Sequence, residues 1–143
     1  MAQAGIEKKS FGRTAGGVAV DAFVLTNGQG TTIEICTYGA TITRLLAPDK
    51  AGWIQDVVLG FDDLAGYETH TAYFGCVVGR VANRLAGGAF HVDGKRWTVP
   101  TNNGPNHLHG GLKGYDKRVW QAVQERKRQL ANGRMHARCF PCF

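Results

Sequence analysis

The apolar and polar positions in the first half of the chain follow the pattern of β-strands. Ile33 and Ile35 alternate with Glu34, which is the two-residue period of a strand with one buried face. Short runs rich in β-branched residues follow on both sides, separated by turn sequences such as Asn27-Gly28-Gln29-Gly30. We therefore predict strands over residues 18–25, 31–38, 41–46 and 54–61.

The clearest local element is a β-hairpin in residues 89–100. Asp93-Gly94 fits a two-residue hairpin turn. The register set by this turn places Phe90 opposite Trp97, and such aromatic pairs stabilise hairpins. Pro100 has no N–H to donate and ends the second strand.

The remaining segments are less regular. Residues 62–70 are polar enough for a helical turn, whereas the apolar, glycine-dotted residues 73–81 are expected to be buried. Residues 101–114 form a polar, glycine-rich loop. Residues 121–130 contain helix-permissive side chains before Asn132-Gly133 but lack a full apolar stripe, so we expect this region to be helical or disordered. Many short strands with turn signals and no internal repeat predict an all-β sandwich.

Composition and charge limit the classes of function. The chain has 143 residues, of which 43% are hydrophobic and 20% charged, as in a globular domain. The net charge of +6 is concentrated at one end: residues 1–120 hold twelve basic and ten acidic residues, and residues 121–143 hold five and one. Five basic residues without ordered aromatics or a known motif do not predict binding to nucleic acid.

No feature of the chain predicts a membrane protein. No apolar run approaches the ~20 residues that span a bilayer. The first ten residues are polar and charged, which argues against a secretory signal and favours a cytoplasmic location.

The four cysteines do not predict a metal or redox site. Cys36 and Cys76 lie in apolar, strand-like surroundings and are expected to be free thiols. Cys139 and Cys142 form a C-x-x-C pair, but no second ligand pair accompanies them.

Residues 74–120 carry several motifs in a fixed order. They are FGCVVGRVANR at residues 74–84, Asp93-Gly94, NNGPNHLHGG at residues 102–111, GYDK at residues 114–117, and Trp120. Upstream, DVVLGFD at residues 56–62 and Tyr38-Gly39-Ala40 belong to the same series. With these motifs in this order and spacing, the sequence resembles the aldose 1-epimerase family over residues 17–120.

The resemblance implies a fold and an activity. The fold is a galactose-mutarotase-like β-supersandwich of mostly antiparallel strands, here incomplete, with residues 1–120 as the N-terminal part of the domain. The activity is that of an isomerase of hexose metabolism, which interconverts the α and β anomers of free hexoses such as galactose and glucose by acid/base ring opening. It implies a free hexose as partner, no cofactor or metal, and no nucleic acid, membrane or obligate protein partner.

The resemblance also implies roles for three residues. Asn83 and Arg84 match a pair that lines the sugar site, where Arg84 would donate charge-assisted hydrogen bonds. His109 matches a histidine that contacts the sugar near its ring oxygen and assists catalysis, and Gly110 and Gly111 would let the backbone approach the ligand. Taken alone, Arg84 would be a solvated strand end and His109 a polar group in a turn. The interpretation as a polar group in a turn is kept for His70 and His107, and His91 is expected to be an exposed residue of the hairpin.

The family's principal catalytic groups are not found in this sequence. The acid is a second histidine, the base is a glutamate, and a sugar-binding aspartate lies between them, all downstream of the Leu-His-Gly-Gly motif. We therefore expect little or no activity from this chain, with a non-catalytic carbohydrate-binding or inert remnant as the alternative. An epimerase of phosphorylated sugars also stays open.

Residues 121–143 match no part of the family's pattern and form a predicted basic tail. We interpret this tail as the product of an altered reading frame, a retained intron or an alternative transcript. A sandwich without its later strands would expose apolar faces and sheet edges, so we predict low solubility.

Overall fold

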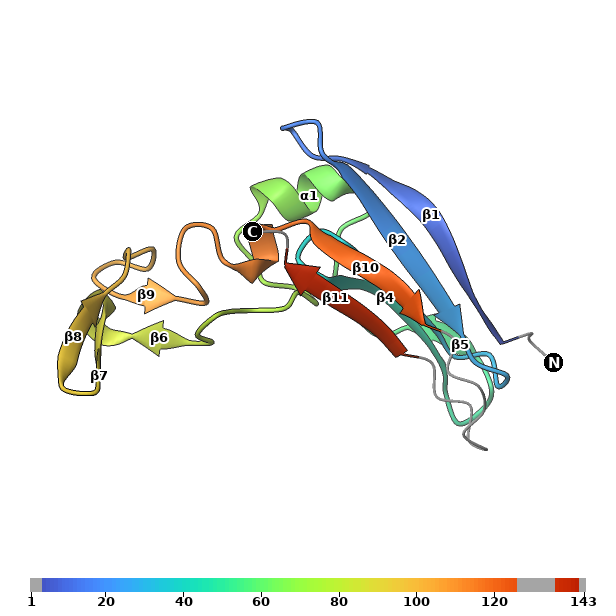
Figure 1. Cartoon of the computed structure of the whole chain (residues 1–143). Helices are drawn as coiled ribbons and strands as arrows, with labels where there is room; N and C mark the ends of the chain where they lie inside the picture. Colours follow the sequence, from blue (N-terminus) through green and yellow to red (C-terminus); the bar gives the residue numbers. More distant parts are fainter. Residues whose placement is uncertain (1–3, 126–135, 142–143) are drawn as a thin grey trace.

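Five antiparallel strands form the main sheet (Figure 1). The computed structural model describes residues 4–125 and 136–141. The strands lie in chain order, so each pairs with its neighbour in the sequence, and this confirms the all-β, antiparallel architecture. They are β1 (Gly5–Arg13), β2 (Ala19–Thr26), β3 (Thr32–Cys36), β4 (Thr41–Pro48) and β5 (Ile54–Asp56).

Strand β1 is not predicted by the hydrophobic pattern, because charged residues fill its middle. It pairs with β2 along its length, and two of its lysines form ion pairs with carboxylates of β2 and β3. Lys8 Nζ lies 2.8 Å from Asp21 Oδ2, and Lys9 Nζ lies 2.6 Å from Glu34 Oε2. Burial raises the pKa of Glu34, but its hydrogen bonds to Lys9 and Thr43 outweigh that effect and leave the pKa below its usual value.

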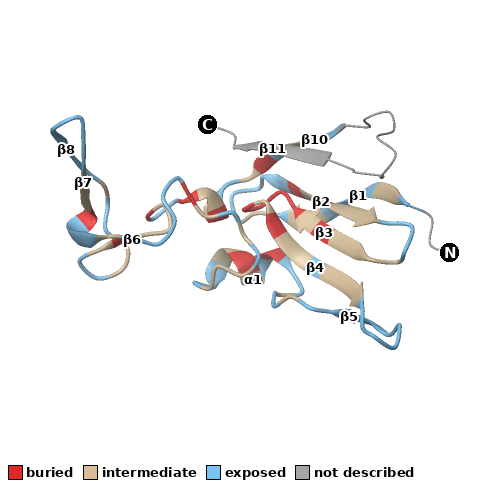
Figure 2. Ribbon diagram, turned by 90° about the horizontal axis from the view of Figure 1, so that it is seen from below, coloured by how far each residue is buried: buried red, intermediate tan, exposed pale blue. Residues whose placement is uncertain are grey.

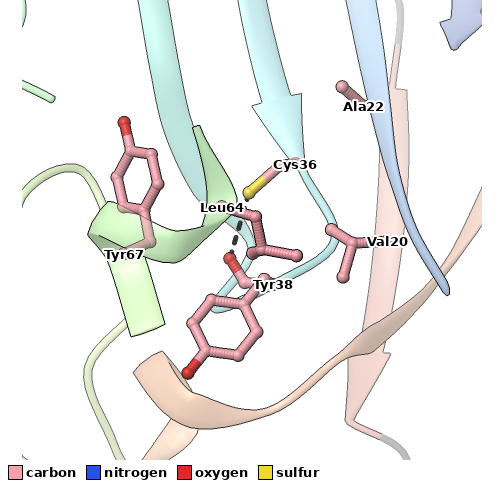
Figure 3. Packing of buried hydrophobic residues seen from close by; sticks show 6 residues of the cluster. All are labelled: Val20, Ala22, Cys36, Tyr38, Leu64 and Tyr67. Carbon is pink, nitrogen blue, oxygen red and sulfur yellow. Dashed lines mark hydrogen bonds between the residues drawn. The ribbon is translucent and has the colours of Figure 1, made fainter. Parts of the chain in front are cut away.

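The core lies where the short helix α1 (Leu64–Thr69) meets the sheet. Asp63 begins the helix by accepting a hydrogen bond from the Gly66 N–H at 2.9 Å, so the predicted helical turn is confirmed. Figure 3 shows the six side chains of the core cluster, which come from β2, β3, the turn after β3 and the helix. They are Val20, Ala22, Cys36, Tyr38, Leu64 and Tyr67.

One predicted strand and one segment expected to be buried differ from the structure. Only Ile54–Asp56 forms a strand within residues 54–61. Residues 73–81 do not form a strand, although Val77 N–H donates to Gly39 O at 2.9 Å and Gly75 O accepts from Ile42 N–H at 2.9 Å. These isolated hydrogen bonds hold the segment against the turn before β4. Val77 is 41% exposed, so the predicted burial is wrong at this position.

The prediction of helix or disorder after Trp120 is wrong for residues 121–125. They belong to β10 (Trp120–Glu125), which pairs antiparallel with β11 (His136–Pro141). The segment lacked the apolar stripe of a helix, and pairing with β11 supplies its backbone hydrogen bonds instead. Residues 126–130 of the predicted helix, and Asn132-Gly133, lie outside the described residues.

A slender extension, called the arm here, runs from residue 84 to residue 108. It contains β6 (Arg84–Leu85), η1 (Ala86–Gly88), β7 (Ala89–Val92), β8 (Lys95–Thr98) and β9 (His107–Leu108). Figures 1 and 2 show it projecting away from the main sheet. Strands β7 and β8 pair in the predicted register, with Phe90 opposite Trp97. A second 3₁₀ helix, η2 (Tyr115–Lys117), follows the arm.

Apolar side chains stay exposed over much of the molecule. The exposed fractions of Trp53, Leu59 and Leu112 are 72%, 73% and 70%. This agrees with the expectation of uncovered apolar faces, while low solubility stays a prediction. Within the described residues, no helix is long and apolar enough to cross a membrane.

Candidate functional site

The base of the arm brings Asn83 next to His109. Strand β6 pairs with β9, with Arg84 opposite Leu108, and this ladder aligns the residues at its end. The Asn83 N–H donates to His109 Nδ1 at 3.0 Å, and the His109 N–H donates to Asn83 O at 3.0 Å. Two residues that are 26 positions apart in the sequence are therefore joined by two hydrogen bonds.

Both residues have an uncommon backbone conformation. Asn83 has φ of 63° and His109 has φ of 51°, in the left-handed region that most side chains avoid. Asparagine and histidine tolerate this region better than most other residues. Such conformations concentrate at functional sites, because the surrounding structure must hold them in place. The reciprocal hydrogen bonds do so here.

Arg84 is fixed beside this pair by two asparagines. Its Nε donates to Asn103 Oδ1 at 2.9 Å, and its Nη1 donates to Asn83 Oδ1 at 3.3 Å. The side chain is exposed, and two of the five N–H donors of a guanidinium are used in these contacts. The guanidinium is therefore held in one orientation while further donors can reach a ligand.

Sequence reasoning assigned no role to Asn102 and Asn103. Asn102 Oδ1 accepts from the Leu108 N–H at 2.7 Å, and its Nδ2 donates to Leu108 O at 2.9 Å. Asn102 thus holds the strand that leads to His109, and Asn103 orients Arg84. Their place in the NNGPNHLHGG motif was the available signal, but the motif does not tell a positioning asparagine from a turn residue.

The hydrogen bond that His109 accepts determines the tautomer of its neutral imidazole ring. Because Nδ1 accepts from a backbone N–H, the proton of the neutral ring is on Nε2. The ring of Tyr73 packs against the imidazole at 4.6 Å between centroids, with 62° between the planes. His109 is therefore oriented from two sides, with Nε2–H as its hydrogen-bond donor.

The buried carboxylate of Asp116, in η2, interacts with this site. It is 9% exposed, and its Oδ1 has no hydrogen-bond partner among the described residues. Burial raises the pKa of Asp116, and the charges of Lys117 and His109 partly oppose that effect. Burial, with the charge of Asp116, also raises the pKa of Tyr73. Asp116 therefore interacts electrostatically with both His109 and Tyr73.

The glycines of the motif are required by packing within the chain, and their approach to a ligand stays a prediction. A side chain on Gly110, which has φ of 101°, would collide with the carbonyl of Gly79. A Cβ on Gly111 would lie 2.9 Å from the His107 ring. The chain itself fills the space beside both glycines, so they allow close packing of the protein.

The other histidines have structural roles, as predicted. His107 is buried and its Nδ1 is 2.8 Å from Pro100 O. His70 Nδ1 accepts from the Ala72 N–H at 2.9 Å, and its ring stacks near Phe74. His91 is exposed on the hairpin, opposite Arg96.

The described residues contain no group of three or more histidine, cysteine or acidic side chains that could hold a metal. Burial raises the pKa of Cys36 to about 11, and burial likewise raises the pKa of Cys76 to about 11. Both are free thiols; Cys36 is buried and Cys76 partly buried. Cys142 and the side chain of Cys139 lie outside the described residues.

A sequence model of the family described as aldose 1-epimerase matches residues 21–136. The chain belongs to this family. The match continues past Trp120, and the division of the chain at that residue stays a prediction. Galactose mutarotase of Bos taurus is 48% identical over 88% of this chain, and aldose 1-epimerase of Escherichia coli (strain K12) is 35% identical over 74%.

Solved structures show the same family fold. A galactose 1-epimerase from Lactobacillus acidophilus NCFM has a TM-score of 0.73 and 25% identity over 87% of this chain. An aldose epimerase homologue from C. elegans has a TM-score of 0.66 and 46% identity over 71%. The chain spans about 35% of the length of the bovine galactose mutarotase and 36% of the Lactobacillus structure. It therefore corresponds to about a third of an aldose 1-epimerase.

Proposed function

We propose that Asn83, Arg84 and His109 form the sugar-binding face of a mutarotase that acts on free hexoses such as galactose or glucose. The observation that carries this proposal is the pair of hydrogen bonds between Asn83 and His109, with Arg84 held beside them. A fixed guanidinium and an imidazole N–H on one surface are suitable donors for the oxygens of a pyranose. Family membership supports the same substrate class.

Anomer exchange requires two proton transfers. A base removes the proton of the anomeric hydroxyl, and an acid protonates the ring oxygen, which opens the ring to the aldehyde. Rotation about the C1–C2 bond and reclosure then invert the anomeric centre. His109 donates its Nε2–H toward the ring oxygen and stabilises the charge that develops there, while Arg84 orients the sugar hydroxyls.

The principal acid and base implied by the family resemblance are a histidine and a glutamate outside this chain. Each such group typically contributes ~10²–10⁴-fold to the rate. We therefore expect the chain to bind hexose weakly and to accelerate mutarotation little. Polarimetry on freshly dissolved α-glucose, corrected for the spontaneous reaction, measures this rate directly.

Sugar binding is tested by ligand-observed NMR with galactose. The Arg84→Ala variant should lose most of the saturation transfer, because Arg84 contributes its donors directly. Arg96→Ala is the matched control, since Arg96 is an exposed arginine on the hairpin. Equal signals from the Arg84→Ala variant and the unchanged chain would refute the proposed site. Glucose and glucose 6-phosphate as further ligands distinguish free from phosphorylated sugars.

A non-catalytic carbohydrate-binding chain is the second candidate. It is favoured by the site itself, because no described carboxylate is hydrogen-bonded to His109 to complete a proton-transferring pair. Binding of galactose without any acceleration of mutarotation would select this candidate. A cytoplasmic location is part of the same proposal.

A further inference from the structure

The arm is connected to the rest of the molecule at the residues that flank it, Asn83 and His109. Figures 1 and 2 show the arm standing apart from the main sheet. Its two sheets, β6 with β9 and β7 with β8, have two strands each, and a two-stranded sheet is marginally stable in water. The two hydrogen bonds between Asn83 and His109 are therefore important for holding the base of the arm.

The two hydrogen bonds differ in their dependence on pH. The bond from the His109 N–H to Asn83 O, at 3.0 Å, joins backbone groups that do not titrate. The bond from the Asn83 N–H to His109 Nδ1, also at 3.0 Å, requires an unprotonated ring nitrogen as its acceptor. A charged imidazole carries a proton on both nitrogens, so two N–H donors would then face each other. Protonation of His109 therefore breaks the second bond.

The position of this bond allows its two groups to separate. It is exposed, so water can pair with the Asn83 N–H and with the ring once they move apart. The ring also packs against Tyr73, at 4.6 Å between centroids. An imidazole that turns away from Asn83 changes this contact and moves its Nε2–H donor.

The loss of this bond also affects Arg84. Asn83 Oδ1 accepts from Arg84 Nη1 at 3.3 Å, and the backbone of Asn83 has φ of 63°. A residue other than glycine keeps such a conformation only where the surrounding contacts impose it. When His109 no longer accepts from Asn83, one of these contacts is lost and the support of Arg84 weakens. One proton thus acts on all three residues of the proposed sugar-binding face.

The neighbours of the His109 ring carry charges of both signs. Asp116, in η2, is buried, and its carboxylate attracts a protonated His109. Arg84, on β6, disfavours a second positive charge nearby. Tyr73 stays uncharged, since burial raises the pKa of its hydroxyl. Histidine is the side chain that generally changes its charge between pH 5 and pH 8.

We propose that the hydrogen bond from Asn83 to His109 is a pH-sensitive switch that controls the base of the arm and the proposed sugar-binding face. At pH 8 the neutral ring holds Asn83, and the three residues form one face. At pH 5 the charged ring releases Asn83, the base of the arm opens, and Arg84 loses one of its two supports. The effect on sugar rests on the proposed function, whereas the switch itself is measured without a ligand.

NMR spectroscopy of the full chain labelled with ¹⁵N measures the switch directly. At pH 8 the ring nitrogen shifts should identify Nδ1 of His109 as the unprotonated nitrogen, with the Asn83 amide protected from exchange. At pH 5 Nδ1 should be protonated, and exchange of the Asn83 amide, corrected for its intrinsic pH dependence, should be at least about tenfold faster. A proton on Nδ1 at pH 8, or an Asn83 amide that stays protected at pH 5, would overturn the proposal.

The variant His109→Asn keeps the switch closed. Its side-chain oxygen takes the place of Nδ1 as acceptor, it tolerates the φ of 51°, and it does not titrate. Exchange of the Asn83 amide should then change by less than about twofold between the two pH values.

The matched control is His91→Asn, because His91 is an exposed histidine on the hairpin, and this variant should keep the pH dependence of the unchanged chain. A pH dependence that persists in His109→Asn would assign the effect to another group, such as the buried His107, and would overturn the proposal.

Galactose titrations at both pH values separate the switch from the proposed function. Ligand-observed NMR should show binding at least about tenfold weaker at pH 5 than at pH 8, because the donors of Arg84 and His109 lose their positions. Opening at pH 5 without galactose binding at either pH supports the switch and counts against the proposed function. Equal binding at both pH values with a protected Asn83 amide counts against the switch alone, and equal binding despite opening refutes its effect on the sugar-binding face.

Discussion

At the scale of single residues, the candidate site depends on side chains that fix others in place. The family resemblance identified Asn83, Arg84 and His109, and the structure joins them by hydrogen bonds, although it leaves their roles untested. The resemblance did not identify Asn103, because an asparagine in a polar loop matches a turn residue equally well. Only the distance of 2.9 Å from Arg84 Nε to Asn103 Oδ1 separates the two interpretations.

We predict that Asn103→Ala weakens galactose binding by roughly two- to tenfold, the range expected for one hydrogen bond. The loss follows from a freely rotating Arg84, so ligand-observed NMR titrations are the measurement. Asn103→Asp keeps the acceptor oxygen and should recover most of the affinity. Equal weakening by the aspartate would show that Asn103 acts through the loop and not through Arg84.

The buried Asp116 predicts how the free energy of unfolding depends on pH. Burial raises its pKa in the folded state, so the folded chain binds the proton more tightly than the unfolded chain. Its stabilising contribution is present below the ordinary carboxyl pKa and is lost as pH rises through the raised value. Asp116→Asn should therefore raise the free energy of unfolding at pH 7 and should change it little at pH 3.

Urea denaturation at both pH values measures this difference. Asp93→Asn, at the exposed tip of the hairpin, is the control and should leave stability within about 0.5 kcal/mol at each pH. A lower stability of Asp116→Asn at pH 7 would show that the ionised carboxylate has a partner that stabilises it.

At the scale of elements, the alternation of hydrophobic and polar residues predicted those strands that have one buried and one exposed face. The register of the hairpin of β7 and β8 was predicted correctly, since Asp93-Gly94 fixes it locally. Strands β1 and β10 were missed, because their pairing depends on partners elsewhere in the chain and their own patterns are weak. Residues 73–81 are apolar yet irregular, and nothing in their composition shows that their hydrogen bonds go to a turn.

The ion pair between Lys9 and Glu34 reaches from β1 to β3, across β2. Lys9→Met should lower the free energy of unfolding by about 1–2 kcal/mol, because it leaves the carboxylate of Glu34 buried without its cation. Lys8→Met removes the more exposed pair with Asp21 and should cost about 0–1 kcal/mol. Thermal or urea unfolding compares the two, and equal losses would mean that the burial of Glu34 does not matter.

At the scale of the whole molecule, the chain has one modest core and several uncovered surfaces. The sequence predicted this, because the resemblance extends over only part of a larger sandwich. The position of the arm was not predictable, since the contacts at its base join segments far apart in the sequence, such as the closely approaching backbones of Gly79 and Gly110. Figure 1 shows the arm projecting away from the main sheet.

Hydrogen–deuterium exchange should divide the molecule in two. We expect amides of residues 84–108 to exchange at least about tenfold faster than those of β2 and β3, because a two-stranded ladder opens without disrupting the core. Uniform protection across the free chain would contradict the independence of the arm.

The hydrogen bonds between Asn83 and His109 have one further consequence. They join the two ends of the arm, at the residues where the chain leaves the rest of the protein and returns to it. An insertion at Asp93 and Gly94 therefore lengthens the arm without moving Asn83 and His109. The hairpin tip is accordingly the position where an inserted peptide or a fluorescent label should leave sugar recognition intact.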